Sequence, residues 1–360
     1  VGSEMCIRDR GGIESPPAFV WYFDFVMKVA AMEIDEKMPE GIGISYRYNI
    51  SYLLRPKRGS GDSMRLRGEQ IVRALLYADD ESALATSVAE SKAVLEILHS
   101  VCLRFGLYIS FKKTFTQVFN CPELDAAESL YTVDGNQVRN VQEFKYLGHT
   151  FDRNDNNAFV ITRVSSAVAQ YQRFRRVFQD RNIQNRSKIR FLEAYVRSRL
   201  SYAVAAVTPT EAQLGQLCVS WYECLRKMTR GGSARKASES GEGQGCSFKF
   251  SNADLDALYS TPPLLDFLHV QFLRYIAHVV RRDNEHPTKT ALFIEPSKKN
   301  VRSPWAKVKF LLGLDKEDCI KKMISKNEFE RALEARFAYL KFDATGQLAK
   351  GLKSEKKIIQ

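Results

Sequence analysis

Residues 71–86 read IVRALLYADDESALAT and contain two short apolar runs separated by a pair of aspartates. The first run ends at Tyr77 and the second begins at Ser82. Two strand-length runs around a short polar break predict a β-hairpin with Asp79 and Asp80 at its tip. On the dipeptide alone a solvated hairpin tip is the commoner explanation, so the surrounding sequence must distinguish a solvated turn from a ligand site.

Adjacent carboxylates provide the oxygen ligands that hard divalent cations prefer. A nucleotidyl transfer uses two such ions, one to activate the attacking hydroxyl and one to steady the departing diphosphate. Because successive residues of a strand face opposite sides, we expect Asp79 to point into a cleft as the principal ligand and Asp80 to be more peripheral.

The segment before the hairpin predicts a helix, a strand and a loop. Apolar residues recur at helical spacing over 19–32, after the break at Ser15-Pro16-Pro17 and before Pro39. Residues 42–54 alternate and are rich in Ile and Tyr, which predicts a strand. Residues 55–68 are basic and contain glycine, which predicts a loop.

The segment after the hairpin predicts a helix and then short strands. Residues 87–105 carry a helical apolar face, with Gly106 placed as the C-terminal cap. The dipeptide Asp134-Gly135 is typical of a tight hairpin turn. Strands are expected at 107–111, 115–119, 130–133 and 144–151.

From Phe159 the pattern changes to long helices, and we expect a domain boundary there. The helices break near 182–185 and at Pro209 and continue to about Met228. Residues 230–247 are small and polar, which predicts a flexible linker. Beyond it we expect helices over 262–282 and 317–340 and a disordered lysine-rich tail from Lys350.

The charge of the chain favours a polyanionic partner. Lys and Arg number 54 against 42 Asp and Glu, which gives a net charge of +12. Residues 161–200 hold ten basic and two acidic side chains, so this segment alone contributes 10 − 2 = +8. Such a concentration predicts a nucleic-acid docking face, with a merely solvated basic helix surface as the alternative.

The cysteine content and hydropathy indicate an intracellular chain, in the nucleus or the cytoplasm. Seven cysteines with no C-x-x-C pair argue against both a disulfide framework and a zinc site. No apolar run is long enough to cross a bilayer, because the stretch 18–31 is interrupted by Asp24 and Lys28. We therefore expect no membrane partner.

The hairpin sequence LLYADD, residues 75–80, resembles the catalytic box of reverse transcriptases, which implies that Tyr77 and Ala78 border the nucleotide site. Upstream, GGIESPPAF at 11–19 resembles the family's Q-G-x-x-x-S-P-x-x-F element, which lies near the templating base and the incoming nucleotide. Arg10 stands where the family has glutamine. The matching residues are Gly11, Ser15, Pro16 and Phe19.

Two downstream elements match in the same order. GLYISFKKT at 106–114 resembles the G-L-x-I-x-x-x-K-T element, which implies that Lys113 neutralises or protonates the departing diphosphate. Taken singly, Lys113 would more often be a solvated strand end. FKYLGHTF at 144–151 resembles the primer-grip hairpin of LINE enzymes, although alone it could be an ordinary edge strand. Its primer-contacting residues would be Tyr146, Leu147 and Gly148.

The basic helices lie where the family carries its thumb and would follow the phosphates of an RNA/DNA hybrid. Aromatic residues interleave with the arginines, and at this spacing Tyr171, Phe174 and Phe178 are more often core than stacking surfaces. The segment 268–293 resembles a stretch that follows the thumb, in which His278 is a plain helix residue. The implied phosphate contacts are Arg173, Arg175, Arg176, Arg186, Lys188 and Arg190.

Together the ordered motifs, over residues 11–293, resemble the C-terminal part of a non-LTR (LINE-type) retrotransposon reverse transcriptase. This implies an α+β fold: a partial polymerase palm with an antiparallel sheet and helices, an all-helical thumb and a loosely attached helical C-terminal region. Residues 1–10 resemble a translated sequencing adaptor. The expected divisions are leader 1–10, palm 11–156, thumb 157–229, linker 230–247, C-terminal region 248–345 and basic tail 346–360.

The resemblance implies an RNA-directed DNA polymerase that uses an RNA template, a DNA primer, deoxynucleoside triphosphates and Mg²⁺ or Mn²⁺. The family's first catalytic aspartate precedes the Q-G element, so we expect this fragment alone to be inactive. The family's fingers, an endonuclease domain and a C-C-H-C knuckle are not expected in it either. Glu81 is a further departure, because the family usually has an apolar residue there.

Three alternatives stay open. The first is a non-catalytic RNA-binding or nucleic-acid-binding relic of such an element, which would bind without regard to magnesium. The second is a group II intron maturase, although the primer-grip pattern and the long segment after the thumb look more like a LINE element. The third is a generic helical interaction module.

Overall fold

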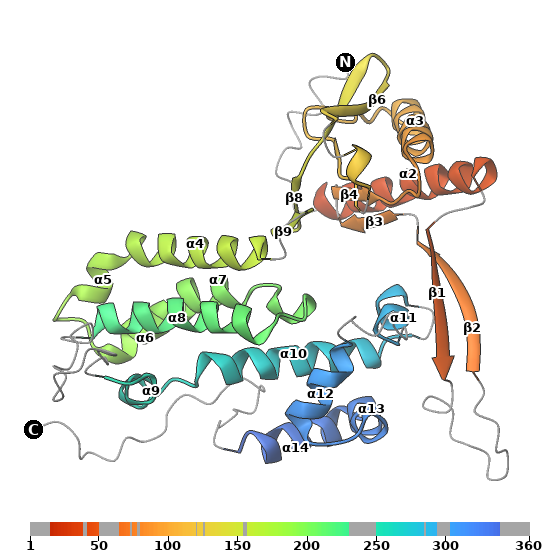
Figure 1. The fold of residues 1–360 in the computed structure, drawn as a ribbon. Coiled ribbons are helices and arrows are strands. Elements are labelled where there is room, and N and C mark those ends of the chain that lie inside the picture. The colour runs from red at the N-terminus through yellow and green to blue at the C-terminus, as the bar shows by residue number, and fades with distance from the viewer. Residues whose placement is uncertain are drawn as a thin grey trace, which may run out of the picture.

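The computed structural model describes residues 15–38, 42–49, 65–72, 74–77, 80–119, 121–124, 127–153, 157–229, 250–283, 286–293 and 303–338 (Figure 1). Small sheets and two helices make up its N-terminal part, and helices make up the rest. The predicted α+β class is confirmed at this level.

Two helices form the core of the N-terminal region. Helix α2 (Ser15–Lys37) packs against helix α3 (Val88–Arg104), and both contribute one apolar face. The opposite face of α2 is open, with Trp21 77% and Met32 72% exposed. The buried residues of α2 recur every three or four positions, as helical packing requires: Val26, Met27, Ala30 and Ile34.

Helix α3 begins and ends as its sequence predicts. The Ser87 side chain accepts a hydrogen bond from the backbone N–H of Glu90 and so caps the first turn. Gly106 adopts φ +71° just beyond the last turn, and the N–H of Leu107 donates to the carbonyl of Cys102 at 2.8 Å. This six-to-one bond is a Schellman ending, which favours glycine because of its positive φ.

The described strands form small sheets, each of two or three strands. The hairpin turn predicted at Asp134-Gly135 is confirmed, with φ values of +48° and +74°. The sheets are β1 (Ile42–Asn49) with β2 (Arg65–Val72), β3 (Ala74–Tyr77) with β4 (Asp80–Ala83), β7 (Asn136–Asn140) between β5 (Phe115–Thr116) and β6 (Ser129–Val133), and β8 (Glu143–Tyr146) with β9 (His149–Asp152).

Some strand predictions are wrong. Residues 65–68, expected in a loop, belong to β2, and so do Ile71 and Val72, which were expected in the hairpin that carries the aspartates. Residues 107–110 are not in a sheet. They alternate because Leu107 and Ile109 pack against the α2–α3 core while Tyr108 is 83% exposed. Local alternation reflects which side chains of this segment are buried, and it does not determine strand pairing.

From residue 158 the described chain is helical, and the breaks predicted near 182–185 and Pro209 are confirmed. Tyr171, Phe178, Leu217 and Trp221 lie fully inside this second core. The elements are α4 (Ala158–Arg173), α5 (Arg175–Gln179), α6 (Asn185–Leu192), the π-helical turn η3 (Glu193–Arg197), α7 (Ser198–Ser201), the 3₁₀ turn η4 (Val204–Ala206) and α8 (Glu211–Met228).

The C-terminal helices are more numerous than predicted. The helix expected over 262–282 is α10, but the single helix expected over 317–340 is two, separated at Ser325. The predicted linker 230–247 and the tail from Lys350 lie outside the described residues. The helices are α9 (Asn252–Tyr259), α10 (Leu264–Val280), α11 (Pro287–Phe293), α12 (Pro304–Leu312), α13 (Lys316–Ile324) and α14 (Lys326–Arg336).

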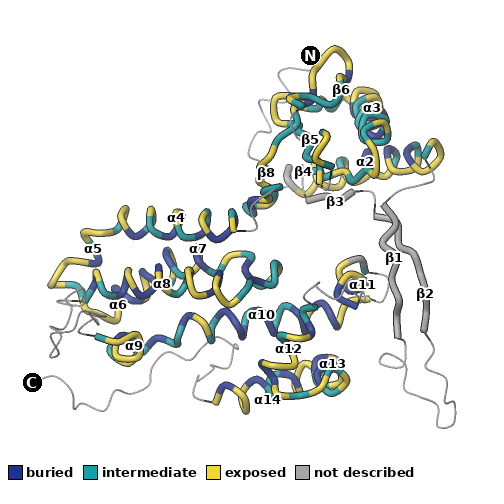
Figure 2. The backbone as a smooth tube through the Cα atoms, viewed as in Figure 1, coloured by how far each residue is buried: buried dark blue, intermediate teal, exposed yellow. Residues whose placement is uncertain are grey.

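Helix α10 belongs to two cores at once. Leu264 and Leu268 at its start pack with α4 to α9, whereas Leu273, Ile276 and Val280 pack with α11 to α14. Buried residues therefore recur along its whole length (Figure 2). The C-terminal region is thus built onto the preceding helices through a shared rigid element, which corrects the expectation of a loose attachment.

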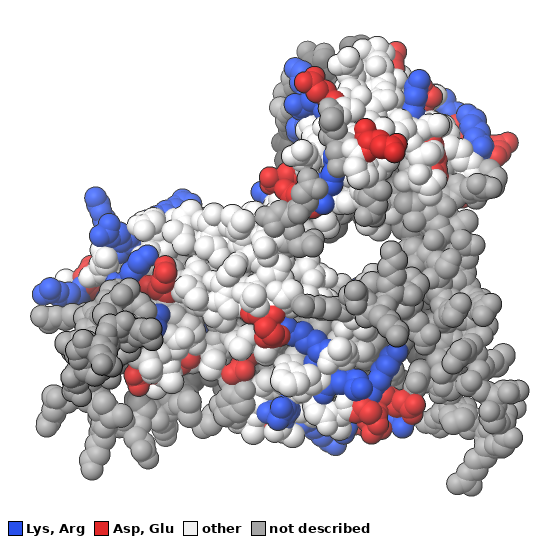
Figure 3. Space-filling model, viewed as in Figure 1, with Lys and Arg blue, Asp and Glu red and all other residues white. Residues whose placement is uncertain are grey.

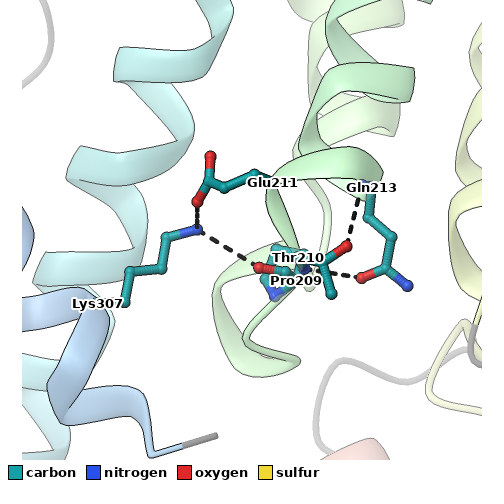
Figure 4. Close-up of polar contacts among 5 residues, drawn as sticks. All are labelled: Pro209, Thr210, Glu211, Gln213 and Lys307. Carbon is teal, nitrogen blue, oxygen red and sulfur yellow. Dashed lines mark hydrogen bonds and ion pairs between the residues drawn. The ribbon is translucent and has the colours of Figure 1, made fainter.

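A polar contact joins the same regions at a second point (Figure 4). Lys307 on α12 lies 3.1 Å from the carboxylate of Glu211 and 3.5 Å from the carbonyl of Pro209, at the start of α8. That start is fixed by a capping box, in which Thr210 and Gln213 each accept a hydrogen bond from the other's backbone N–H.

His269 on α10 is buried beside this contact. Burial and the nearby Lys307 ammonium lower the pKa of its imidazole to about 4, and Glu211 opposes them. In the unfolded chain a histidine titrates near pH 6.5. Between these two values the unfolded state binds a proton that the folded state does not. The titration of His269 therefore costs no stability above pH 6.5 and lowers the free energy of unfolding as the pH falls below that value.

We expect His269→Leu to weaken this acid sensitivity. At pH 5 the titration of His269 should cost the wild-type fold about 2 kcal/mol that it does not cost at pH 8. Urea unfolding at the two pH values measures the difference. His278→Leu on the exposed side of α10 is the control, and an equal acid loss in wild type and His269→Leu would contradict the prediction.

Candidate active site and nucleic-acid interface

The predicted acidic hairpin is present as strands β3 and β4. They pair antiparallel, with Leu75 opposite Ser82 and Tyr77 opposite Asp80. Asp80 is the first residue of β4 and is exposed, as a carboxylate that meets a ligand must be. The predicted site residues Ala78 and Asp79 lie outside the described residues, and only the backbone of Tyr77 is described.

Glu81 occupies an inward position of β4. Its carboxyl is half-buried, and desolvation raises its pKa to about 7. After burial itself, the Glu81 charge is what raises the pKa of the Cys102 thiol on α3. Glu81 therefore lies toward the α2–α3 core, where an apolar residue would avoid the desolvation. Desolvation is therefore a physical reason for the apolar residue expected at position 81, and nothing in the structure explains the acid that stands there.

The predicted primer-grip hairpin, β8–β9, contacts the acidic hairpin directly. The Tyr146 hydroxyl on β8 donates a hydrogen bond to the Leu75 carbonyl on β3 at 3.2 Å. Burial raises the pKa of Tyr146, and the charges of Asp80 and Glu81 raise it further. Two segments that are 71 residues apart in the chain thus lie side by side.

The turn of this hairpin, Leu147-Gly148, is held from the helical region. Both residues have positive φ, +48° and +75°, which the two-residue turn requires and which glycine adopts without strain. The Tyr202 hydroxyl donates to the Leu147 carbonyl at 2.8 Å, and the Arg163 guanidinium donates to the Gly148 carbonyl. A Cβ on Gly148 would contact the Tyr202 ring at 3.4 Å.

Arg163 is a buried cation, although it lies on a helix whose other arginine is exposed. Its guanidinium lies 4.8 Å from the centroid of the Tyr202 ring, so Tyr202 and Arg163 support each other as they bind the turn. Burial lowers the pKa of Arg163, Tyr202 opposes that shift, and Arg199 adds to it. No local sequence pattern singles out Arg163 or Tyr202, because the residues they bind are 15 and 55 positions away.

Other predicted site residues are not brought to the hairpins by any described contact. Lys113 is exposed in a turn over residues 111–113, and no described interaction joins it to Asp80. Phe19 on α2 is 44% exposed and stacks on Phe23 at 5.9 Å. Gly11 lies outside the described residues, and the side chains of Ser15 and Pro16 are not described.

The predicted phosphate contacts are exposed with one exception. Lys188 on α6 is only 6% exposed, so its position does not suit a phosphate contact. Basic side chains gather at the end of the molecule where α4 meets α5 (Figure 3). The exposed residues of the predicted set are Arg173, Arg175, Arg176, Arg186 and Arg190.

The aromatic residues between these arginines divide into two kinds. Tyr171 and Phe178 stack on each other at 5.0 Å inside the core, as expected for core residues. Phe174 is half-buried and contacts Phe191 and Tyr195, which are 40% and 43% exposed. The sequence reasoning missed Phe191 and Tyr195, although their four-residue spacing on a basic helix was a usable signal.

The described residues supply one carboxylate of the proposed metal site. Asp80 is a hard oxygen donor of the type that Mg²⁺ prefers. Within the described ranges no group of three His, Cys, Asp or Glu side chains could hold a metal ion. Asp79, the expected principal ligand, is outside those ranges, so the donor chemistry fits Mg²⁺ but the ligand geometry is not defined.

Comparisons of the chain with protein-family models, with curated proteins and with solved structures find no match. Among the described helices, none is both long and apolar enough to cross a membrane.

We expect Arg163→Met to destabilise the fold by about 2 kcal/mol, because it removes a charged hydrogen bond and leaves the partly buried carbonyl of Gly148 without that donor. Equilibrium unfolding in urea measures the loss. Arg190→Met, at an exposed position on α6, is the matched control and should change stability by less than about 0.5 kcal/mol. Equal effects of the two substitutions would refute the role assigned to Arg163.

Proposed function

We propose that this chain is part of an RNA-directed DNA polymerase of the non-LTR (LINE-type) reverse transcriptase family. In this proposal β3–β4 carries the metal-binding carboxylates, β8–β9 positions the primer end, and α4 to α8 bind the RNA/DNA hybrid. The substrates are an RNA template, a DNA primer and deoxynucleoside triphosphates.

The observation that carries the proposal is the contact between the two hairpins. Each resembles a separate element of the family, and nothing in the local sequence of one requires it to meet the other. A polymerase has to place the primer 3′ end beside its metal-binding carboxylates. The hydrogen bond from Tyr146 to Leu75 supports such an arrangement, since it joins the primer-grip hairpin to the strand that leads to the aspartates.

The roles of the residues follow from their chemistry. Mg²⁺ held by Asp79 and Asp80 would activate the primer hydroxyl and stabilise the departing diphosphate. Lys113 would neutralise or protonate that diphosphate, and the backbone of Tyr146, Leu147 and Gly148 would support the primer end. Arg163 and Tyr202 hold the two carbonyls of the turn, so they act as positioning residues for the grip.

The basic helices support the nucleic-acid part of the proposal. Residues 161–200 carry a charge of 10 − 2 = +8, and the arginines at the α4–α5 junction are exposed. Phosphate contacts of this kind bind without sequence preference and weaken as salt increases. The same arginines would also serve a non-catalytic binder, so the decisive test has to depend on the carboxylates.

We expect a complementary deoxynucleotide to strengthen the binding of an RNA template annealed to a 3′-dideoxy DNA primer about threefold or more in Mg²⁺ or Mn²⁺. Ternary-complex formation is measured rather than extension, because it reports on the metal-binding carboxylates without requiring turnover. Fluorescence polarisation with a labelled primer gives the dissociation constants. Asp79→Asn combined with Asp80→Asn should abolish the gain without weakening nucleotide-free binding.

The matched control is Asp134→Asn. Asp134 is an exposed aspartate in another hairpin turn, and asparagine tolerates its φ of +48°. A gain that is absent, that any nucleotide produces, or that survives the double substitution would contradict the polymerase proposal. Metal-independent binding with no nucleotide effect would favour the nucleic-acid-binding relic.

A further inference from the structure

Three aromatic rings form a cluster on the surface where α4, α6 and η3 meet. Tyr195 lies 4.6 Å from Phe174 and 5.4 Å from Phe191, measured between ring centroids, and the planes of Phe191 and Tyr195 differ by 27°. Phe174 is anchored, since it packs against the core of the helical region. Phe191 and Tyr195 are 40% and 43% exposed, so their rings are accessible. We call Phe174, Phe191 and Tyr195 the aromatic cluster.

The backbone beneath the cluster is unusual. Tyr195 is the central residue of η3 (Glu193–Arg197), a π-helical turn between α6 and α7. Such turns are rare and recur at functional sites, because they reposition side chains at some cost in helix hydrogen bonding. Here the buried side of the segment stays regular, with Leu192, Val196 and Leu200 in the core. The exposed side carries Phe191 and Tyr195, whose rings stack on each other at 5.4 Å, so a base would stack on the outer face of the pair.

The surroundings of the cluster are cationic. The Arg173 guanidinium lies 5.7 Å from the centroid of the Phe174 ring, and Arg190 is exposed next to Phe191 in the chain. Glu193, the acid nearest to the rings in sequence, is already paired, because its carboxylate accepts a hydrogen bond from the Arg197 guanidinium at 2.8 Å. Basic side chains dominate this end of the molecule (Figure 3). The cluster therefore combines flat apolar rings with excess positive charge.

This combination fits the chemistry of an unpaired nucleic-acid strand. Exposed bases stack on aromatic side chains, and their phosphates pair with arginine. A duplex or a hybrid buries the faces of its bases and would meet only the arginines. An acidic peptide would use the charge but would leave the rings without flat partners. Under the proposed function, the unpaired strand that the chain meets is the RNA template outside the hybrid.

We propose that the aromatic cluster binds a single-stranded segment of RNA, whose bases stack on Phe191 and Tyr195 and whose phosphates pair with Arg173 and Arg190. The inference deepens the proposed function and rests on it for the choice of RNA. Stacking on each ring contributes enough that its loss should weaken binding about tenfold. The rings would make the surface prefer single strands to hybrids, and the arginines would contribute affinity for both.

The test compares an unstructured single-stranded oligoadenylate RNA with a blunt RNA/DNA hybrid of equal length, both labelled for fluorescence polarisation. We expect Phe191→Leu combined with Tyr195→Leu to weaken single-strand binding about tenfold or more and hybrid binding less than about twofold. Leucine keeps an apolar side chain at these exposed positions and removes the flat ring. Thermal unfolding followed by circular dichroism verifies that the variant folds.

Two controls separate ring chemistry from general disturbance. Phe191→Tyr combined with Tyr195→Phe keeps both rings and should keep single-strand affinity within about twofold. Tyr108→Leu removes a ring that is 83% exposed elsewhere on the surface and should have no effect. Single-strand binding that the leucine variant leaves unchanged, or an equal loss with the hybrid, would overturn the proposal.

The outcome is distinguishable from failure of the polymerase proposal. Single-strand stacking does not use Asp79 or Asp80, and the nucleotide-dependent gain does not use Phe191 or Tyr195. Ring-dependent RNA binding without a nucleotide effect would support the cluster and count against the polymerase. A nucleotide effect without ring dependence would do the reverse.

Discussion

Two hydrogen bonds to one turn help to hold the N-terminal region against the helices, together with the stacking of His149 on Phe159 and the hydrogen bond between the Thr150 and Thr162 hydroxyls. Leu147 and Gly148 reverse the chain with positive φ, so their carbonyls point away from the β8–β9 ladder and need other donors. Tyr202 and Arg163 supply them. Because the Arg163 guanidinium is buried, its interactions with the carbonyl and the Tyr202 ring offset part of its desolvation.

These two hydrogen bonds connect the helical region to the acidic hairpin through β8–β9. Arg163 on α4 and Tyr202, directly after α7, hold the turn of the β8–β9 hairpin. In the same hairpin, the Tyr146 hydroxyl donates a hydrogen bond to the Leu75 carbonyl of the acidic hairpin. A displacement of α4 would thus be transmitted through β8–β9 to the strand that leads to Asp79 and Asp80. On the far side α10 connects the helical core to the C-terminal helices by sharing its length between two apolar clusters. The charged surface of the helices and the acidic hairpin are therefore parts of one packed assembly.

Sequence patterns predicted the features that neighbouring residues determine. Asp134-Gly135 forces a tight turn, and Ser87 and Gly106 bound α3, because a cap or a positive φ acts within a few residues. Residues 144–151 were expected as a strand, and the structure divides them into β8 and β9 at the turn Leu147-Gly148. Residues 107–110 show the limit, since their alternation reports burial against α2–α3 and not pairing. The expected helix 317–340 failed for a related reason. Ser325 has an extended backbone, and its side chain accepts a hydrogen bond from the N–H of Glu328 and so caps the start of α14. Helical periodicity alone does not detect such a break.

The strands of the candidate site could be predicted from the sequence, but the contacts that hold these strands in place could not. Tyr146 could be named from its motif, but its bond to Leu75 spans 71 residues and no local pattern encodes such a distance. The same holds for Arg163, which is one of ten basic residues in the segment 161–200 and proved to be buried. Lys188 shows the converse, because composition placed it with the phosphate contacts while the helix face that it occupies is buried.

The acidic hairpin and the basic helices have charges of opposite sign, and the proposed function would use both. Asp79, Asp80 and Glu81 are consecutive acids, and without a cation they would repel phosphates. The excess of +8 in residues 161–200 provides attraction that does not involve those acids. Burial also raises the pKa of Glu81 to about 7, so near neutral pH this carboxyl carries only part of its charge. Under the proposed function, the helices would therefore bind nucleic acid first, and the acidic hairpin would contribute only when a divalent cation reverses the sign of its interaction with phosphate.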